Sequence, residues 1–250
     1  MRAFFRLHDG LAREAPGDDA ATREALRRLR LPWSPHSVLD LGCGPGRATL
    51  VLARELLCPI LAVDLHAPFL DRLARDAAAA GLDGLVTPRC ADFGALAVAP
   101  RSVDLIWSEG AIYHLGFAAG LRIWSPLLSA RGRLAVTELT WRVPPDERPA
   151  EIAEYWRAAY PAMTSVEDNL TAARAANYRV VDHFPLPRRA WSNYYDPLIA
   201  RADALAPTAD PELAAVISET RLEADMHRRY GHTYDYVFYL LRALRPPTPA

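Results

Sequence analysis

Short apolar runs alternate along this chain with segments whose apolar residues recur at helical spacing. The runs predict seven strands, at 37–42, 59–64, 85–91, 103–107, 133–139, 178–185 and 234–241. The segments between them predict helices, which end near 31 and 57, cross 69–73, and occupy 117–128, 149–160 and 165–176. Strands that alternate with helices are typical of a parallel sheet covered on both faces, so we expect an α/β fold.

The pattern becomes less regular after Val143-Pro144-Pro145. The region before the last strand has helical spacing, and the pair Asp210-Pro211 is typical of a helix start. We interpret 193–230 as a helical insertion that either covers a ligand crevice or faces a partner subunit. The proline-rich end, 245–250, is expected to be a frayed tail.

A glycine-rich turn, Gly42-Cys43-Gly44-Pro45-Gly46, joins the first predicted strand to a helix. Glycine has no Cβ, so the backbone of such a turn can approach an adenosine-bearing cofactor closely. The second strand ends in Asp64, about 20 residues past Gly44, where a carboxylate can accept hydrogen bonds from both ribose hydroxyls. A dinucleotide fingerprint that starts at Gly42 would need glycine where this chain has Arg47, which disfavours a pyrophosphate ligand.

Two later strand ends also carry polar residues, in Cys90-Ala91-Asp92-Phe93 and in Ser108-Glu109-Gly110-Ala111. With Asp40 before the glycine turn, these segments resemble the ordered motifs of the class I S-adenosylmethionine-dependent methyltransferases. The resemblance implies a cofactor site made of Asp40, Gly42, Cys43, Gly44, Gly46, Asp64, Leu65, Asp92, Phe93 and Glu109. Taken alone, Asp64 is equally suited to cap a helix and Asp92 to form a turn.

The resemblance also implies a Rossmann-like, doubly wound, seven-stranded sheet whose last two strands form an antiparallel hairpin. It spans nearly the whole chain, which is expected to be one domain with a helical cap over 1–35, a cofactor-binding core over 36–140 and substrate-side elements over 141–250. The segment from Trp107 to Phe117 is similar to that of a bacterial branch whose substrates are mostly unassigned. That branch often has Asn at position 114, where this chain has His114.

Three residues after the fourth strand, Glu109, Tyr113 and His114, are candidates for catalysis. A methyltransferase needs a general base only when its acceptor carries a proton at neutral pH, and histidine has a suitable ordinary pKa. Each candidate has a structural alternative. His114 could lie on a helix surface, Glu109 could contact the cofactor or cap a helix, and Tyr113 could simply pack.

Aromatic side chains follow the same strand ends and could build an acceptor pocket. The candidate substrate contacts are Tyr113, His114, Trp141, Tyr160, Trp191 and Tyr195. Aromatic residues at helical spacing are more often part of a hydrophobic core, so that alternative stays open.

The amino-acid composition limits the classes of molecule that this chain is expected to bind. The net charge of −1 argues against a nucleic-acid substrate, and all basic residues are arginine, which excludes Schiff-base chemistry on lysine. Cys43, Cys58 and Cys90 have no C-x-x-C spacing, so we expect neither a metal site nor disulfides, and a reduced, cytoplasmic setting. No apolar run is long enough to span a membrane. A homodimer is possible.

Three hypotheses about function stay open. The first is an enzyme that transfers a methyl group from S-adenosylmethionine to a small molecule. The second is a nicotinamide-dependent oxidoreductase on a related sheet, and the third is a non-catalytic protein that binds the cofactor.

Overall fold

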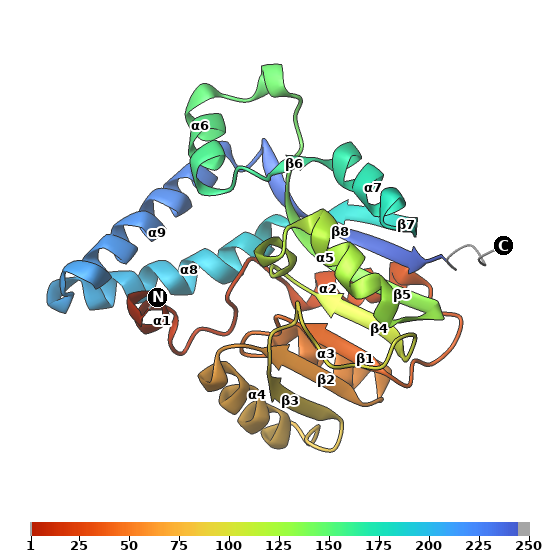
Figure 1. Ribbon diagram of the computed structural model, residues 1–250. Coiled ribbons are helices and arrows are strands. Elements are labelled where there is room, and N and C mark those ends of the chain that lie inside the picture. The colour runs from red at the N-terminus through yellow and green to blue at the C-terminus, as the bar shows by residue number, and fades with distance from the viewer. Residues whose placement is uncertain (1, 245–250) are drawn as a thin grey trace.

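The computed structural model describes residues 2–244 and contains one mixed sheet with the strand order β3-β2-β1-β4-β5-β8-β7 (Figure 1). All seven predicted strands are present: β1 (Val38–Leu41), β2 (Ile60–Asp64), β3 (Val86–Cys90), β4 (Val103–Ser108), β5 (Leu128–Trp141), β7 (Tyr178–Pro185) and β8 (Tyr234–Ala243). A two-residue strand, β6 (Thr164–Ser165), pairs with the end of β5 and makes the sheet eight-stranded. Strand β8 runs antiparallel to both of its neighbours, which confirms the predicted hairpin.

Helices cover both faces of the sheet, as expected for a doubly wound fold. Helices α2 (Asp19–Leu29), α3 (Arg47–Leu56) and α4 (Ala67–Ala79) pack with one apolar cluster. Helices α5 (Phe117–Trp124) and α7 (Val166–Ala175) pack with the cluster on the opposite face. The central strands β1, β4 and β5 are buried by helices on both faces, which explains why their sequences are almost continuously apolar.

Local signals in the sequence set several helix starts. The Asp18 carboxylate accepts hydrogen bonds from the backbone N–H groups of Ala20 and Ala21 at the start of α2. Ser165 and Asp168 form a capping box at the start of α7. Short 3-10 turns follow β4 (Ile112–His114), α5 (Ser125–Leu127), β5 (Pro145–Glu147) and the insertion's first helix (Ala206–Thr208).

A third layer lies beyond the carboxyl end of β5 and the amino end of β8. It contains α1 (Arg2–His8), α6 (Ala150–Ala159), α8 (Arg188–Leu205) and α9 (Pro211–Tyr230), which pack around a third apolar cluster. The insertion between β7 and β8 therefore begins at Arg188, earlier than the predicted 193. Pro149 precedes α6 as its N-cap, where the expectation was the first helical turn. The expected tail at 245–250 lies outside the described residues.

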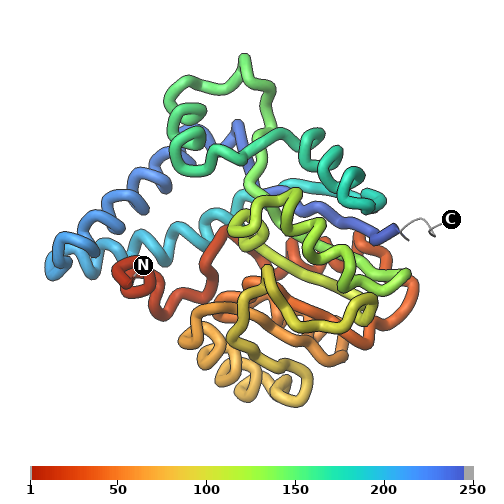
Figure 2. The backbone as a smooth tube through the Cα atoms, in the orientation of Figure 1, coloured from red at the N-terminus to blue at the C-terminus, as the bar shows by residue number. Residues whose placement is uncertain are grey.

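Helix α1 is one of the elements that connect the third layer to the rest of the fold (Figure 2). The Arg201 guanidinium of α8 donates a 2.7 Å hydrogen bond to the carbonyl of Leu7, and Arg6 forms an ion pair with Asp210 at the start of α9. On its other side, α1 approaches α4 through Phe5, whose ring contacts Phe69. Among the helices described here, none combines the length and apolar character that crossing a membrane requires.

Candidate active site

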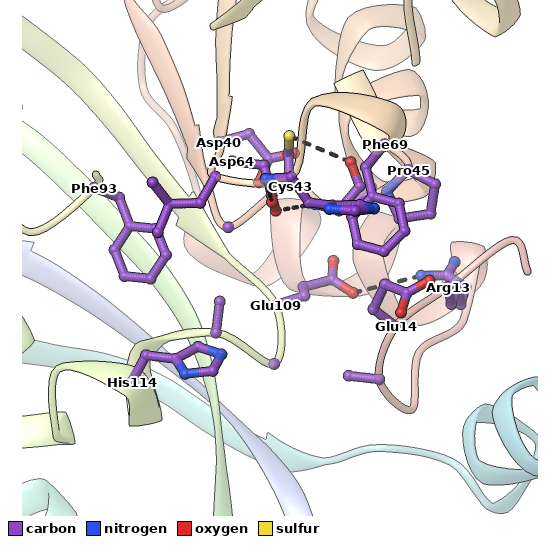
Figure 3. Close-up of a pocket in the computed structure, with 18 of the residues that line it drawn as sticks. Arg13, Glu14, Asp40, Cys43, Pro45, Asp64, Phe69, Phe93, Glu109 and His114 are labelled. Carbon is purple, nitrogen blue, oxygen red and sulfur yellow. Dashed lines mark hydrogen bonds and ion pairs between the residues drawn. The ribbon is translucent and has the colours of Figure 1, made fainter. Parts of the chain in front are cut away.

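A cavity of about 760 Å³ opens at the carboxyl ends of β1, β2 and β4, at the edge where ligands bind in open α/β sheets (Figure 3). Most of the predicted site residues line it: Asp40, Gly42, Cys43, Gly44, Asp64, Leu65, Asp92, Phe93, Glu109, Tyr113 and His114. The structure therefore brings together residues that are far apart in the sequence. Gly46 does not line the cavity and instead precedes helix α3 as its N-cap.

The glycine turn follows β1 with backbone angles that favour glycine. Gly42 has a φ of 71°, and a Cβ at this position would lie 2.3 Å from the Cβ of Ala111. The N–H groups of Gly42 and Cys43 both donate to the carbonyl of Val63, at 2.8 and 3.0 Å. This contact ties the turn to the end of β2, so the turn and Asp64 are held at a fixed spacing.

Asp64 is held by two backbone hydrogen bonds. One carboxylate oxygen accepts from the N–H of Gly44 at 2.9 Å, and the other accepts from the N–H of His66 at 2.9 Å. Each oxygen has a further lone pair, so the carboxylate can still accept hydrogen bonds from a diol in the cavity. His66, not Asp64, is the N-cap of α4.

Asp40 and Asp92 are held in different ways. Asp40 is buried below the turn and accepts a 2.5 Å hydrogen bond from the Thr49 hydroxyl. Burial, with a smaller contribution from the charges of Glu109 and Asp64, raises the pKa of Asp40 to about 7. Asp92 is exposed and accepts from the N–H of Gly94 at 2.7 Å, while the Phe93 ring beside it is buried in the cavity wall.

Glu109 lies between Phe93 and His114 on one side and Glu14 and Arg13 on the other (Figure 3). One of its carboxylate oxygens accepts hydrogen bonds from the Thr22 hydroxyl at 2.7 Å and from the Trp107 indole N–H at 2.8 Å. The other oxygen is buried without a hydrogen-bond partner among the described residues, and it lies 3.9 Å from the Arg13 guanidinium. Burial raises the pKa of Glu109 because it disfavours the charged carboxylate, and a cation in the cavity would favour that charged form again.

Several lining residues from the N-terminal segment were not predicted. Arg13 is nearly buried and donates a 2.6 Å hydrogen bond to Asp19. Glu14 lies against Gly44 and shares a 2.7 Å hydrogen bond with the His8 ring, and burial raises its pKa. This segment has no regular secondary structure, so it leaves no periodic pattern in the sequence. The only sign of a functional role was the charged pair Arg13-Glu14 just before a turn-forming Pro-Gly.

The N-terminal helix completes the wall. The ring of Phe5 stacks on His66, with centroids 3.6 Å apart and planes within 2°. Leu65, beside His66, keeps 64% of its surface exposed, which leaves an apolar side chain available to a ligand. The Asp64 end of the cavity is therefore bordered by α1 and by the loop after β2.

Tyr113 and His114 form the wall on the far side of the glycine turn. Tyr113 keeps 40% of its surface exposed, and burial raises its pKa to about 12. Burial lowers the pKa of His114, so its imidazole is neutral at pH 7 and able to accept a proton. Its ring centroid is 6.5 Å from that of Phe93.

The other predicted substrate residues do not line this cavity. Trp141, Trp191 and Tyr195 are buried in the third apolar cluster, and Tyr160 packs against that cluster. Tyr160 donates a 2.6 Å hydrogen bond to Glu138, and its ring is 6.0 Å from that of Tyr113. Their roles in substrate binding stay predictions. Within residues 2–244, no three potential ligands gather closely enough to hold a metal ion.

Comparison with known proteins agrees with this geometry. Residues 38–132 match a family described as "Methyltransferase domain". The chain is 40% identical over 79 residues to dimethylglycine N-methyltransferase of Parasynechococcus marenigrum (strain WH8102), over 32% of this chain and 28% of that protein. It is 30% identical over 115 residues to glycine/sarcosine/dimethylglycine N-methyltransferase of Actinopolyspora halophila, over 44% of this chain and 20% of that protein. The chain thus spans less than a third of either relative.

The fold is similar over nearly the whole chain to a solved structure. This is the S-adenosylmethionine-dependent methyltransferase from Thiobacillus denitrificans in complex with S-adenosyl-L-homocysteine, with a TM-score of 0.81, 22% identity, and coverage of 97% of this chain and 98% of that one. The expected Rossmann-like fold is confirmed, and residues 38–132 within it match the methyltransferase domain family.

Proposed function

Because the chain belongs, through its methyltransferase domain, to the class I S-adenosylmethionine-dependent methyltransferases, we propose that it transfers a methyl group to a small-molecule acceptor. The observation that carries this proposal is the single cavity that joins the glycine turn, Asp64 and the Arg13–Glu109 pair. A nicotinamide dinucleotide fits less well. Arg47 begins α3 at the position of the third glycine, and its side chain is paired with Asp19.

The charges of the cavity match the cofactor part by part. Asp64 would accept hydrogen bonds from the two ribose hydroxyls, and Asp92 with Phe93 would hold the adenine. The amino-acid tail is a zwitterion, and Arg13 and Glu109 offer one charge for each of its ends. The unpartnered oxygen of Glu109 supports this arrangement, because a buried carboxylate oxygen without a partner costs free energy that a bound ammonium would recover.

When bound, S-adenosylmethionine supplies an already activated methyl group. The chain then has to hold the acceptor in line with that group and exclude water, which is where most of the rate enhancement arises. Tyr113 and His114 are placed to do this, since they border the cavity beyond the glycine turn. A neutral His114 can also accept a proton from an acceptor that carries one.

We propose that the three segments of the chain have the roles that the sequence predicted. The N-terminal 35 residues close over the cofactor, 36–140 hold it, and the later segments hold the acceptor. A cytoplasmic setting and a homodimer are parts of this proposal that cell fractionation and sedimentation of the purified protein would test.

The test is transfer of a labelled methyl group from S-adenosylmethionine into a size-fractionated cell extract, with Asp64→Ala as the matched variant. We expect label in the small-molecule fraction with the wild type and far less with the variant, whose cofactor binding should weaken by about 1–3 kcal/mol. Label in protein or nucleic acid would contradict the proposed acceptor class. Tight cofactor binding with no transfer would favour the non-catalytic alternative.

A further inference from the structure

A buried carboxylate that the cofactor site does not use lies close to that site. Glu138 is near the carboxyl end of β5 and is 2% exposed. It follows Thr137, whose hydroxyl accepts a 2.7 Å hydrogen bond from the N–H of Gly110 in the cavity wall. One oxygen of Glu138 accepts from the Tyr160 hydroxyl at 2.6 Å, and the other is buried with no partner among the described residues.

Tyr160 contacts this carboxylate directly, and Tyr194 and Tyr236 pack against the same apolar cluster as Tyr160. Tyr113 lines the cofactor cavity, and its ring lies 6.0 Å from that of Tyr160. The pKa of Tyr236 on β8 is raised by burial and also by the nearby Tyr113, Glu138 and Tyr194. The four phenol groups therefore lie together, and Tyr113 connects them to the cavity.

A second carboxylate, Glu223 of α9, faces the same group of side chains. Its charge acts on Tyr113, Tyr194 and Tyr236, and it accepts a 2.8 Å hydrogen bond from the Tyr195 hydroxyl. Neither Glu138 nor Glu223 forms an ion pair with any residue in the described part of the chain. The region beyond Tyr113 thus combines aromatic faces with two carboxyl groups that have no cationic partner among the described residues.

We propose that this region, defined by Tyr113, Glu138, Tyr160, Tyr194, Glu223 and Tyr236, binds the methyl acceptor as an organic amine that carries no carboxylate or phosphate. The inference rests on the proposed methyltransferase function. Aromatic faces and buried carboxylates attract an ammonium group, and the partnerless oxygen of Glu138 offers it a charge-assisted hydrogen bond. The same two carboxylates repel an anionic acceptor.

The arrangement also provides a group that can remove the proton of a protonated amine. A protonated amine has no free lone pair, so it must lose a proton before it can attack a methyl group. The Glu138 carboxylate accepts that proton and becomes neutral. The nitrogen lone pair then forms the new C–N bond while the methyl–sulfur bond breaks, and the electrons of that bond stay on sulfur. The products are a methylated ammonium ion and a neutral thioether.

Calorimetric titration of the protein saturated with S-adenosylhomocysteine tests the inference. The probes are matched in shape: N,N-dimethylethanolamine, N,N-dimethylglycine, which adds a carboxylate, and 3-methylbutan-1-ol, which lacks the nitrogen. Cyclohexylamine and tyramine extend the range of amine sizes. We expect at least one amine to bind tenfold or more tightly than both the carboxylate and the alcohol. Equal binding of the three matched probes, or no binding of any amine, would overturn the inference.

Variants separate a binding role from a structural one. Glu138→Gln should lower amine affinity at least tenfold and leave S-adenosylhomocysteine affinity within twofold of the wild type. The control is Asp235→Asn, a buried carboxylate of β8 whose oxygens already contact Trp191 and Arg142, and which should retain amine affinity. Unchanged amine affinity in Glu138→Gln would refute this inference but would leave the proposed methyltransferase function untouched. Absence of S-adenosylhomocysteine binding by the wild type would refute the proposed function itself.

Discussion

The two ends of the site are built in different ways. The cofactor end is held largely by backbone hydrogen bonds at the ends of parallel strands, as at Gly42, Gly44 and Asp64. The acceptor end uses side chains from β5, β8, α8 and α9, and it leaves a buried oxygen of Glu138 without a hydrogen-bond partner among the described residues. The glycine turn and Asp64 are therefore organised before any ligand arrives. The unpartnered oxygens of Glu109 at the cofactor end and of Glu138 at the acceptor end carry a cost that a bound cation would offset.

The largest effect is expected where the cofactor end depends on the backbone. In Gly42→Ala the new Cβ would overlap Ala111 in a turn that already needs a positive φ, so we expect cofactor affinity to fall more than 100-fold. Gly81→Ala is the control, because it also has a positive φ, of 67°, but open space around the new atom. Calorimetry with S-adenosylhomocysteine measures both. Equal affinities in the two variants would mean that the turn is less rigid than its contacts indicate.

At the acceptor end, a substitution should instead be favourable: removing the charge of Glu138 should raise the free energy of unfolding. Burial raises the pKa of Glu138 to about 8 from 4.5, so the folded protein binds a proton there that the unfolded chain has lost. This group therefore lowers stability progressively as pH rises from about 4.5 to 8. At pH 9 we expect Glu138→Gln to unfold with a free energy about 2–4 kcal/mol higher than the wild type.

Urea titrations at pH 5 and pH 9 measure this difference, which should nearly vanish at the lower pH. Asp168→Asn is the contrasting control. Hydrogen bonds from Ser165 and Thr164 lower the pKa of Asp168, so its contribution is present at high pH and is lost as pH falls. A Glu138→Gln protein that is less stable at pH 9 would show that Glu138 is a structural group.

A smaller effect is expected for Arg13, the cation that the sequence did not predict. Arg13→Gln should weaken S-adenosylmethionine binding by about 1–3 kcal/mol, through loss of a charge-assisted hydrogen bond to the amino-acid tail. The matched ligand is 5′-methylthioadenosine, which lacks that tail and should bind both proteins equally. If both ligands weaken together, Arg13 only supports the fold of the N-terminal segment.

The smallest effect concerns the aromatic stack between Phe5 and His66. Phe5→Ala should raise the dissociation constant of S-adenosylhomocysteine by about 2–10-fold, which corresponds to roughly 0.5–1.5 kcal/mol for an aromatic pair. Leu222→Ala, an exposed apolar residue of α9, is the control and should have no effect. Unchanged binding in Phe5→Ala would place α1 outside the cofactor site.

The sequence was sufficient for the sheet and for most of the cofactor end. Strand periodicity is a local property, and the glycine turn and Asp64 mark strand ends that a parallel sheet must bring together. A functional role for Glu138 was not predicted, because this residue lies in a largely apolar segment whose pattern indicates only a strand. Glu223 was missed for a related reason. Acidic residues are common on helix surfaces, and only tertiary packing shows that this one faces inward.

Helix α1 has a consequence for the order of events during turnover. It borders the cofactor cavity through Phe5, and Arg201 and Asp210 hold it against α8 and α9. We therefore expect this helix to move before spent cofactor leaves, and opening of the N-terminal segment, rather than chemistry, to limit the steady state. Rapid mixing of enzyme and both substrates would then give a burst of one product per active site, followed by a slower linear phase.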